Sequence, residues 1–385
     1  MSALNTRTRC FFALFGIFQS LPVYNIEKTT LRSVQLKKIL FTGGGSAGHV
    51  IPNIALINDL RAKGSADVCY MGSGGIEKSI VTTQKIPYFE IACPKLVRGF
   101  SFRAFKNNLR IPFAFRRAVK QAEKGLRTFQ PSAVFSKGGY VALPVVFAAR
   151  KLGIPCFAHE SDFSIGLANK LSAKKCKCVF TSFPETANKL KNGVYSGAPI
   201  KRELFHSSPI QARKKFGVPT NMKTVLVFGG GSGSEAINAA LRSQLTTLSK
   251  RHFILHVCGK GNVVHSTYQN YRQEEFIADM GAAYACADLI VSRAGAGAVF
   301  EILALKKPSI LIPLENASRG DQKENAAYFE KRGLCHVLPQ SKLSQLDGEI
   351  EATFLDVKLQ TALNESSFRV GNDFIIQKLL QAVEK

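Results

Sequence analysis

Short runs of consecutive apolar residues alternate along this chain with segments whose apolar residues recur every three or four positions. The runs predict buried strands, and the spaced segments predict helices. The predicted strands cover residues 38–42, 68–71, 89–93, 131–135, 155–159, 178–181, 224–228, 252–258, 288–292 and 309–313. Strands that alternate with helices favour parallel, doubly wound sheets, whose ligands collect at the carboxyl ends of the strands.

Two of these strands run into glycine-rich turns that precede a helix. Residues 43–45 follow the strand at 38–42, and residues 229–233 follow the strand at 224–228. Such a turn leaves backbone N–H groups and the positive end of a helix dipole pointing at one spot, which suits a phosphate. Because the unit occurs twice, about 185 residues apart, we expect two similar α/β domains that face each other across a cleft.

The length of 385 residues and a hydrophobic content of 45% are typical of a two-domain globular protein. We expect an N-terminal extension (1–36), a first Rossmann-like domain (37–200) and a second one (201–370). A final helix (371–385) could pack back on the first domain. Nine scattered cysteines give no disulfide framework and no metal-binding spacing, so neither is expected.

The N-terminal extension has an ambiguous pattern. Arg7 and Arg9 precede an apolar stretch at 10–18, as in a targeting peptide, but no small-residue cleavage site follows. A targeting segment, a membrane-surface anchor and a start upstream of the native one are all open interpretations. The sequence has no apolar run of about 18 residues, so no membrane-spanning helix is predicted.

The positive charge is concentrated in the first half. Residues 1–200 hold 29 Lys and Arg against 9 Asp and Glu, whereas the remainder holds 23 against 18. Within residues 95–127, basic side chains are mixed with phenylalanines, a pattern typical of a surface that binds anionic lipid. A helix packed through its Phe face is an alternative, and nucleic acid is a weaker one because no nucleic-acid motif accompanies the stretch. The predicted membrane contacts are Phe102, Arg103, Phe105, Arg110, Phe113 and Arg116.

Two stretches of the second half carry candidate chemistry. In residues 292–303 a strand end, a Gly/Ala loop and a helix start place Glu301 behind a phosphate-sized turn, where a carboxylate suits ribose hydroxyls. In residues 319–325 a polar segment precedes a helix. There Asp321 and Gln322 could bind the hydroxyls of a sugar.

Several motifs together resemble one family. They are GGGSAGHVIPN (43–53), SKGGYVALP (136–144), HESDFSIGLANKL (159–171), GGGSGSEAIN (229–238), FIADM (276–280), SRAGAGAVFE (292–301) and SRGDQKENAAYF (318–329). The chain resembles the UDP-N-acetylglucosamine transferases of peptidoglycan lipid assembly, within the two-domain GT-B glycosyltransferases. The segments at 159–171 and 318–329 look most like the low-GC Gram-positive branch.

The resemblance implies a GT-B fold and an inverting enzyme without metal or cofactor. It would move N-acetylglucosamine from UDP-N-acetylglucosamine to lipid I, the undecaprenyl-diphosphate-linked muramoyl pentapeptide, at the cytoplasmic membrane face. His49 would be the general base. The implied substrate-binding residues are Ser46, Ala47, Gly48, Asp162, Lys201, Gly230, Gly231, Ser232, Ile277, Ala296, Gly297, Ala298, Val299, Phe300, Glu301, Asp321, Gln322 and Asn325.

Within that set, the resemblance assigns the first glycine-rich loop to the lipid diphosphate and the second to the nucleotide phosphates. Ile277 would read uracil through its backbone. This chain departs from the family at Lys201, where arginine is common and lysine loses a bidentate phosphate grip, and at Gly231 and Ser232. A GT-B enzyme with another lipid acceptor, and a non-catalytic homologue that binds nucleotide sugars, are the alternative functions.

Overall fold

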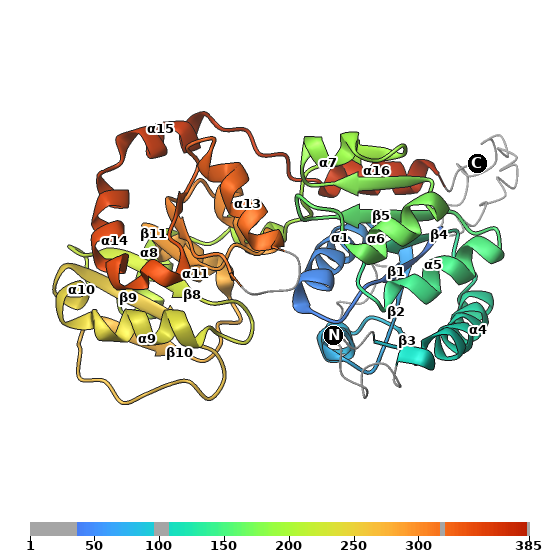
Figure 1. Cartoon of the computed structure of the whole chain (residues 1–385), viewed down its shortest axis with the longest axis horizontal. Coiled ribbons are helices and arrows are strands. Elements are labelled where there is room, and N and C mark those ends of the chain that lie inside the picture. The colour runs from blue at the N-terminus through green and yellow to red at the C-terminus, as the bar shows by residue number, and fades with distance from the viewer. Residues whose placement is uncertain (1–36, 96–107, 316–319, 383–385) are drawn as a thin grey trace, which may run out of the picture. The chain divides into compact units, whose positions relative to one another are not determined.

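The structure is a computed structural model that describes residues 37–95, 108–315 and 320–382. The N-terminal extension, and Phe102, Arg103 and Phe105 of the predicted membrane contacts, lie outside the described residues. The described part forms two α/β halves, each a parallel sheet with helices on both faces (Figure 1).

The first half contains a seven-stranded parallel sheet in the order β3-β2-β1-β4-β5-β6-β7. Its strands are β1 (Lys37–Thr42), β2 (Ala66–Gly72), β3 (Tyr88–Glu90), β4 (Ala133–Ser136), β5 (Cys156–Glu160), β6 (Cys178–Thr181) and β7 (Gly193–Tyr195). Its helices are α1 (Ile51–Ala62), α2 (Ile76–Thr83), α4 (Ile111–Phe129), α5 (Ala142–Lys151), α6 (Leu167–Ser172) and α7 (Pro184–Asn188), with 3-10 turns at Ala47–His49 and Ala173–Lys175.

The apolar runs are continuous because both faces of the sheet are covered. In β1, Ile39 and Phe41 belong to the core on one face, and Leu40 belongs to the core on the other. All three side chains are fully buried.

The second half contains a six-stranded parallel sheet in the order β10-β9-β8-β11-β12-β13. The strands are β8 (Lys223–Phe228), β9 (His252–Val257), β10 (Tyr271–Glu274), β11 (Leu289–Ser292), β12 (Ser309–Leu311) and β13 (His336–Val337). The helices are α8 (Pro209–Phe216), α9 (Glu235–Ser243), α10 (Leu245–Arg251), α11 (Met280–Cys286), α12 (Ala296–Ala304), α13 (Asp321–Glu330), α14 (Leu346–Leu355) and α15 (Val357–Glu365), with 3-10 turns at Arg202–Phe205 and Gln340–Gln345.

The last helix, α16 (Asn372–Gln381), returns to the first half and contacts α1 (Figure 1). Ile375, Ile376 and Leu379 join the core of that half. Asn372 is fully buried and its amide donates to Asp59 Oδ2 at 2.8 Å and to the Ile200 carbonyl at 2.9 Å. These contacts attach the end of the chain to the first sheet.

The prediction of two doubly wound parallel sheets is confirmed, although the apolar pattern missed β7, β10 and β13. These three strands have two to four residues each and lie at sheet edges. The β10 segment reads YRQE, so it offers no apolar run. The strand predicted at 89–93 is shorter in the structure, where β3 ends at Glu90.

Among the described residues, no helix combines the length and the apolar content needed to cross a bilayer.

His336 in β13 lies between two carboxylates. Its Nδ1 is 2.6 Å from Glu349 Oε1, and its Nε2 is 2.9 Å from Asp356 Oδ2. Burial opposes protonation, but hydrogen bonds to the two carboxylates outweigh it, so the pKa of His336 is raised above its ordinary value of 6.5. The hydrogen bond with His336 lowers the pKa of Asp356 below its ordinary value of 3.8.

These shifts predict a pH-dependent loss of stability in a His336→Ala variant. A raised histidine pKa gives stabilisation that is complete below pH 6.5 and disappears as the pH rises through the folded-state pKa. The lowered pKa of Asp356 gives stabilisation that is complete above 3.8 and is lost only as the pH falls through the folded-state value. We therefore expect His336→Ala to lower the Tm clearly at about pH 6 and much less at about pH 9. Thermal unfolding at both pH values tests this, with the exposed His265→Ala as control, and equal losses at both would contradict it.

Candidate active site

A cavity of about 350 Å³ lies at the carboxyl ends of strands from both sheets. Segments after β1, β4 and β5 line it from the first half, and segments after β8 and β11, with the start of α13, line it from the second. The lining residues are Ser46, Gly48, His49, Lys137, Glu160, Ser161, Asp162, Phe228, Gly229, Gly230, Arg293, Gly295, Ala296, Gly297, Ala298, Asp321 and Gln322. The structure therefore brings together predicted site residues that are far apart in the sequence.

His49 ends the 3-10 turn that follows the first glycine-rich loop. Its ring lies against Gly139, where an added Cβ would be 3.1 Å from His49 Cδ2 and 2.3 Å from the Gly44 carbonyl. Gly139 also has a φ of +79°, which strongly favours glycine. The glycine after β4 thus allows the two loops to meet, and it leaves His49 at the wall of the cavity.

The first glycine-rich loop is held from behind by a buried carboxylate. Glu77 in α2 is fully buried, and its oxygens accept hydrogen bonds from the Gly45 amide at 3.1 Å, the Ser73 amide at 3.1 Å and the Ser73 hydroxyl. The Gly45 amide is therefore not free for a phosphate, and the expectation that the other amides of this loop bind one stays a prediction. The sequence pattern gave no sign that the Gly45 amide donates to the Glu77 side chain.

The loop after β5 is organised by Glu160. This carboxylate accepts from the Asp162 amide at 3.1 Å, the Gly166 amide at 2.7 Å and Asn169 Nδ2 at 2.9 Å. Asp162 is thereby held at the cavity. Burial, and secondarily the charge of Glu160, raise the pKa of Asp162.

The start of α13 contributes Asp321 and Gln322 to the cavity. Asp321 Oδ1 accepts from the Ser164 hydroxyl at 2.8 Å, and Gln322 Oε1 accepts from the Leu314 amide at 3.0 Å. Within the described residues no hydrogen bond is made by Gln322 Nε2, so its N–H groups can donate to a sugar hydroxyl.

Asn325, one turn further along α13, occupies a different environment. It is fully buried, its Oδ1 accepts from the Phe163 amide at 3.0 Å, and its Nδ2 donates to Asp162 Oδ1 at 3.0 Å. The side chain joins the two halves of the molecule. It could bind a sugar only if these hydrogen bonds were exchanged.

The second glycine-rich loop is open to solvent. Gly230, Gly231 and Ser232 are exposed, while an added Cβ on Gly233 would be 2.1 Å from the Cys258 carbonyl. Its exposed backbone suits a nucleotide diphosphate.

Arg293 lies beside this loop and was absent from the predicted site. Its guanidinium donates to Ser234 Oγ and Gln340 Oε1, both at 2.7 Å, and to the carbonyls of Ile312 and Pro313 at 3.3 and 3.4 Å. It holds the second loop against the end of β12.

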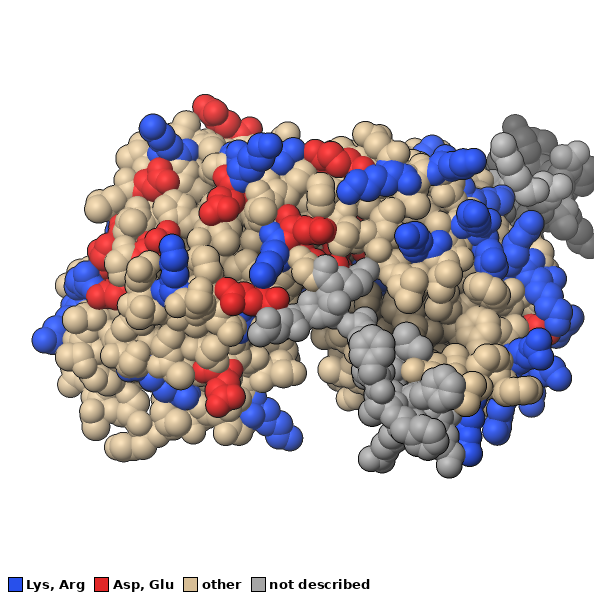
Figure 2. Space-filling model, in the orientation of Figure 1, with Lys and Arg blue, Asp and Glu red and all other residues tan. Residues whose placement is uncertain are grey.

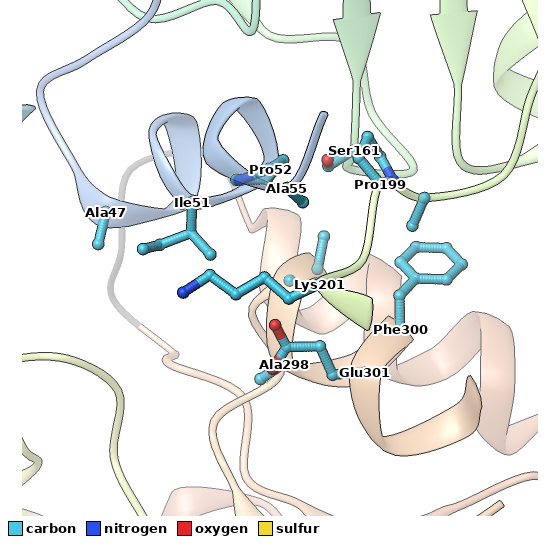
Figure 3. A pocket seen from close by; sticks show the side chains of 14 residues that line it. Ala47, Ile51, Pro52, Ala55, Ser161, Pro199, Lys201, Ala298, Phe300 and Glu301 are labelled. Atoms are coloured by element: carbon cyan, nitrogen blue, oxygen red, sulfur yellow. The ribbon is translucent and has the colours of Figure 1, made fainter. Parts of the chain in front are cut away.

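A smaller cavity of about 160 Å³ adjoins the first and contains Glu301 and Lys201 (Figure 3). The Tyr284 hydroxyl donates to Glu301 Oε2 at 2.9 Å. Burial raises the pKa of Glu301, although Tyr284 and the charge of Lys201 oppose the shift. Lys201 thus lies near the predicted ribose carboxylate, and Ala47 and Gly48 line the same cavity from the first half.

The remaining predicted residues either lie outside the linings of the two cavities or have side chains that pack in the protein core. Gly231, Ser232, Ile277 and Val299 are outside the lining of both cavities. Phe300 is 5% exposed, and its ring packs in an aromatic cluster 5.1 Å from that of Phe183 and 5.5 Å from that of Phe329. Contacts from Ile277 and Val299, which are also buried, would have to come from the backbone.

Within residues 37–95, 108–315 and 320–382, no group of three or more His, Cys, Asp or Glu is arranged to hold a metal ion.

Comparisons with known proteins match both halves. Residues 39–181 match the glycosyltransferase family 28 N-terminal domain, and residues 224–373 match the glycosyltransferase family 28 C-terminal domain. A Clostridium kluyveri protein named UDP-N-acetylglucosamine–N-acetylmuramyl-(pentapeptide) pyrophosphoryl-undecaprenol N-acetylglucosamine transferase is 42% identical over 91% of this chain and 99% of its own. A protein of the same name from Lachnoclostridium phytofermentans is 44% identical over 80% of this chain and 88% of its own.

Solved structures agree with these matches. The crystal structure of Acinetobacter baumannii MurG has a TM-score of 0.69 and 26% identity, covering 90% of this chain and 99% of that one. A Neisseria meningitidis UDP-GlcNAc 2-epimerase, at 15% identity and a TM-score of 0.62 over 89% of this chain and 100% of that one, shares the fold. The resemblance inferred from the motifs is confirmed, and the chain belongs to the MurG family of glycosyltransferase family 28.

Proposed function

We propose that this protein transfers N-acetylglucosamine from UDP-N-acetylglucosamine to lipid I, forming lipid II for peptidoglycan synthesis. The proposal is carried by the cavity in which His49 meets glycine-rich loops from both halves. The names of the relatives at 42% and 44% identity support the choice of donor and acceptor.

In the proposed reaction, the C4 hydroxyl oxygen of the muramoyl sugar attacks the anomeric carbon of the donor. The bond from that carbon to the phosphate oxygen breaks, the new glycosidic bond forms with inversion, and His49 takes the hydroxyl proton. Backbone N–H groups at Gly230 and at the start of α12 would stabilise the charge of the leaving UDP. The proposal uses no metal ion or other cofactor.

The direct test is UDP release by the full-length protein from UDP-N-acetylglucosamine, with and without a short-chain lipid I analogue. We expect release only when the analogue is present. Donor binding without turnover would overturn the proposed acceptor and would direct the search to other lipid-linked acceptors.

We also propose that the first half docks on the cytoplasmic face of the membrane through α4. One face of the helix packs inward through Ala118, Ala122 and Leu126, which are buried. The alternative interpretation of this stretch, a helix packed against the protein, therefore holds for that face only. The other face exposes Phe113 (74%) and a row of basic residues. Figure 2 shows Lys and Arg gathered over this side of the molecule with few acidic residues among them. An exposed aromatic residue within a basic surface favours anionic lipid.

Reversing the charge of this surface should weaken membrane binding. Each basic residue near an anionic bilayer contributes roughly 1 kcal/mol, so Arg110→Glu with Arg116→Glu should lower partitioning into phosphatidylglycerol vesicles by roughly 100-fold or more. Vesicle co-sedimentation at low and high salt measures this. The matched control is Lys250→Glu with Lys331→Glu, two exposed residues of the second half, and an equal loss in both pairs would contradict a specific docking face.

A further inference from the structure

Lys137 is the first residue after β4 and lies at the point where the strand order of the first sheet reverses. The chain builds β1, β2 and β3 towards one edge and then places β4 on the other side of β1. Thr42 and Ser136 are partners at the ends of these two strands, and the Lys137 amide donates to the Thr42 carbonyl at 2.8 Å. Doubly wound sheets bind ligands in the crevice at this reversal.

The side chain of Lys137 is 2% exposed, and the residue lines the larger cavity beside His49. Burial lowers its pKa, which the nearby charges of Glu160 and Asp162 only partly oppose. Neither carboxylate is within ion-pair distance, and the hydrogen bonds of the described residues include none from its ammonium. A buried lysine in this state costs folding free energy, which indicates a role other than stability.

Two other groups near this point that could hold an anion are already engaged. The Gly45 amide of the first loop donates to Glu77. Arg293, the other lysine or arginine among the described residues that line this cavity, uses its guanidinium to support the second loop. Of these two basic lining residues, Lys137 is therefore the one whose side-chain nitrogen makes no hydrogen bond within the described residues and can donate to an anion.

We propose that Lys137 binds the diphosphate of the substrate held by the first half, the lipid-linked acceptor, and so positions its sugar hydroxyl at His49. This inference rests on the proposed function for the identity of the acceptor. Lys137 has no carboxylate at ion-pair distance, and an incoming diphosphate would supply the missing negative partner. The negative charge of the diphosphate also favours the protonated form of the lysine. The second half has its own open glycine-rich loop for the donor diphosphate, so the two diphosphates are held by different halves.

The test compares Lys137→Met, which removes the charge at similar length, with Lys137→Arg. For Lys137→Met we expect the KM for a short-chain lipid I analogue to rise roughly tenfold or more, since one charge-assisted contact is lost. The KM for UDP-N-acetylglucosamine should stay near the wild-type value. Lys137→Arg should recover part of the loss because it keeps the charge. The exposed Lys174→Met is the matched control.

A second acceptor analogue identifies the contacted group. Replacing the diphosphate by a monophosphate should weaken binding of the analogue to the wild type. The same replacement should change the affinity of Lys137→Met much less, because this variant already lacks the contact. Thermal unfolding should show Lys137→Met at least as stable as the wild type, which separates a binding role from a structural one.

The outcomes distinguish the two proposals. If the wild type turns over the analogue and Lys137→Met has an unchanged acceptor KM, the inference fails and the proposed function stands. A rise in the donor KM alone would assign Lys137 to the donor and overturn the inference. If the wild type shows no turnover, calorimetric titration of the analogue still compares the variants. If the analogue then binds Lys137→Met more weakly than the wild type, the inferred diphosphate contact stands although the proposed function fails. If it binds both proteins equally, the inference and the proposed function are both overturned.

Discussion

Replacing His49 by alanine is expected to lower kcat by roughly 100- to 10,000-fold, the range for loss of a general base. His49 lines the cavity shared by the two halves, and Gly139 gives its ring room between the loops after β1 and β4. An alanine there cannot take the acceptor proton. The proposed contacts to the nucleotide lie in the second half, so we expect binding of UDP-N-acetylglucosamine to change little.

The measurement is steady-state UDP release with the lipid I analogue, together with calorimetric titration of the donor. The exposed His265→Ala serves as the control for loss of a histidine. Turnover within a few-fold of wild type in His49→Ala would show that another group accepts the proton. Equal losses of turnover and donor binding would indicate a structural role.

The sequence predicted which loops form the site because each of these loops belongs to a short, contiguous segment of the chain. A strand, a glycine-rich turn and a helix are contiguous in the chain, and the carboxyl ends of parallel strands meet at one edge. The motifs that contain His49 and Glu301 therefore identified residues that line the two cavities. The edge strand β10 escaped prediction because its residues are polar and its pairing to β9 is a tertiary contact.

The contacts that a sequence cannot show are those between segments far apart in the chain. Glu77 is 32 residues from Gly45, whose amide it engages, and Asn325 is 163 residues from Asp162. No local pattern signals either pair. Lys137 stood within a recognised motif, but its significance lies in its burial without a carboxylate at ion-pair distance, which depends on the packing of β1, β4 and β5.

Replacing Glu301 by glutamine is expected to lower kcat/KM for the donor by roughly 100-fold, since a carboxylate that accepts two ribose hydroxyls loses a charge-assisted acceptor at each. Glutamine keeps the size of the side chain, and its carbonyl oxygen can still accept from the Tyr284 hydroxyl. The effect thus reports on the ribose contact more than on packing. Because burial raises the pKa of Glu301, an uncharged glutamine should leave the folded protein at least as stable at neutral pH.

The raised pKa also sets a pH dependence. If the carboxylate form binds ribose as proposed, the affinity for UDP-N-acetylglucosamine, measured by calorimetric titration, should fall as the pH drops towards the pKa of Glu301, at a pH above the ordinary value of 4.5. Glu301→Gln should lose this decrease in donor affinity at acid pH. The exposed Glu324→Gln controls for removal of a carboxylate. An unchanged donor affinity in Glu301→Gln, or a decrease at acid pH that persists in it, would assign the ribose contact and the titrating group to other residues, because Glu301 is the carboxylate among the described residues that line the smaller cavity.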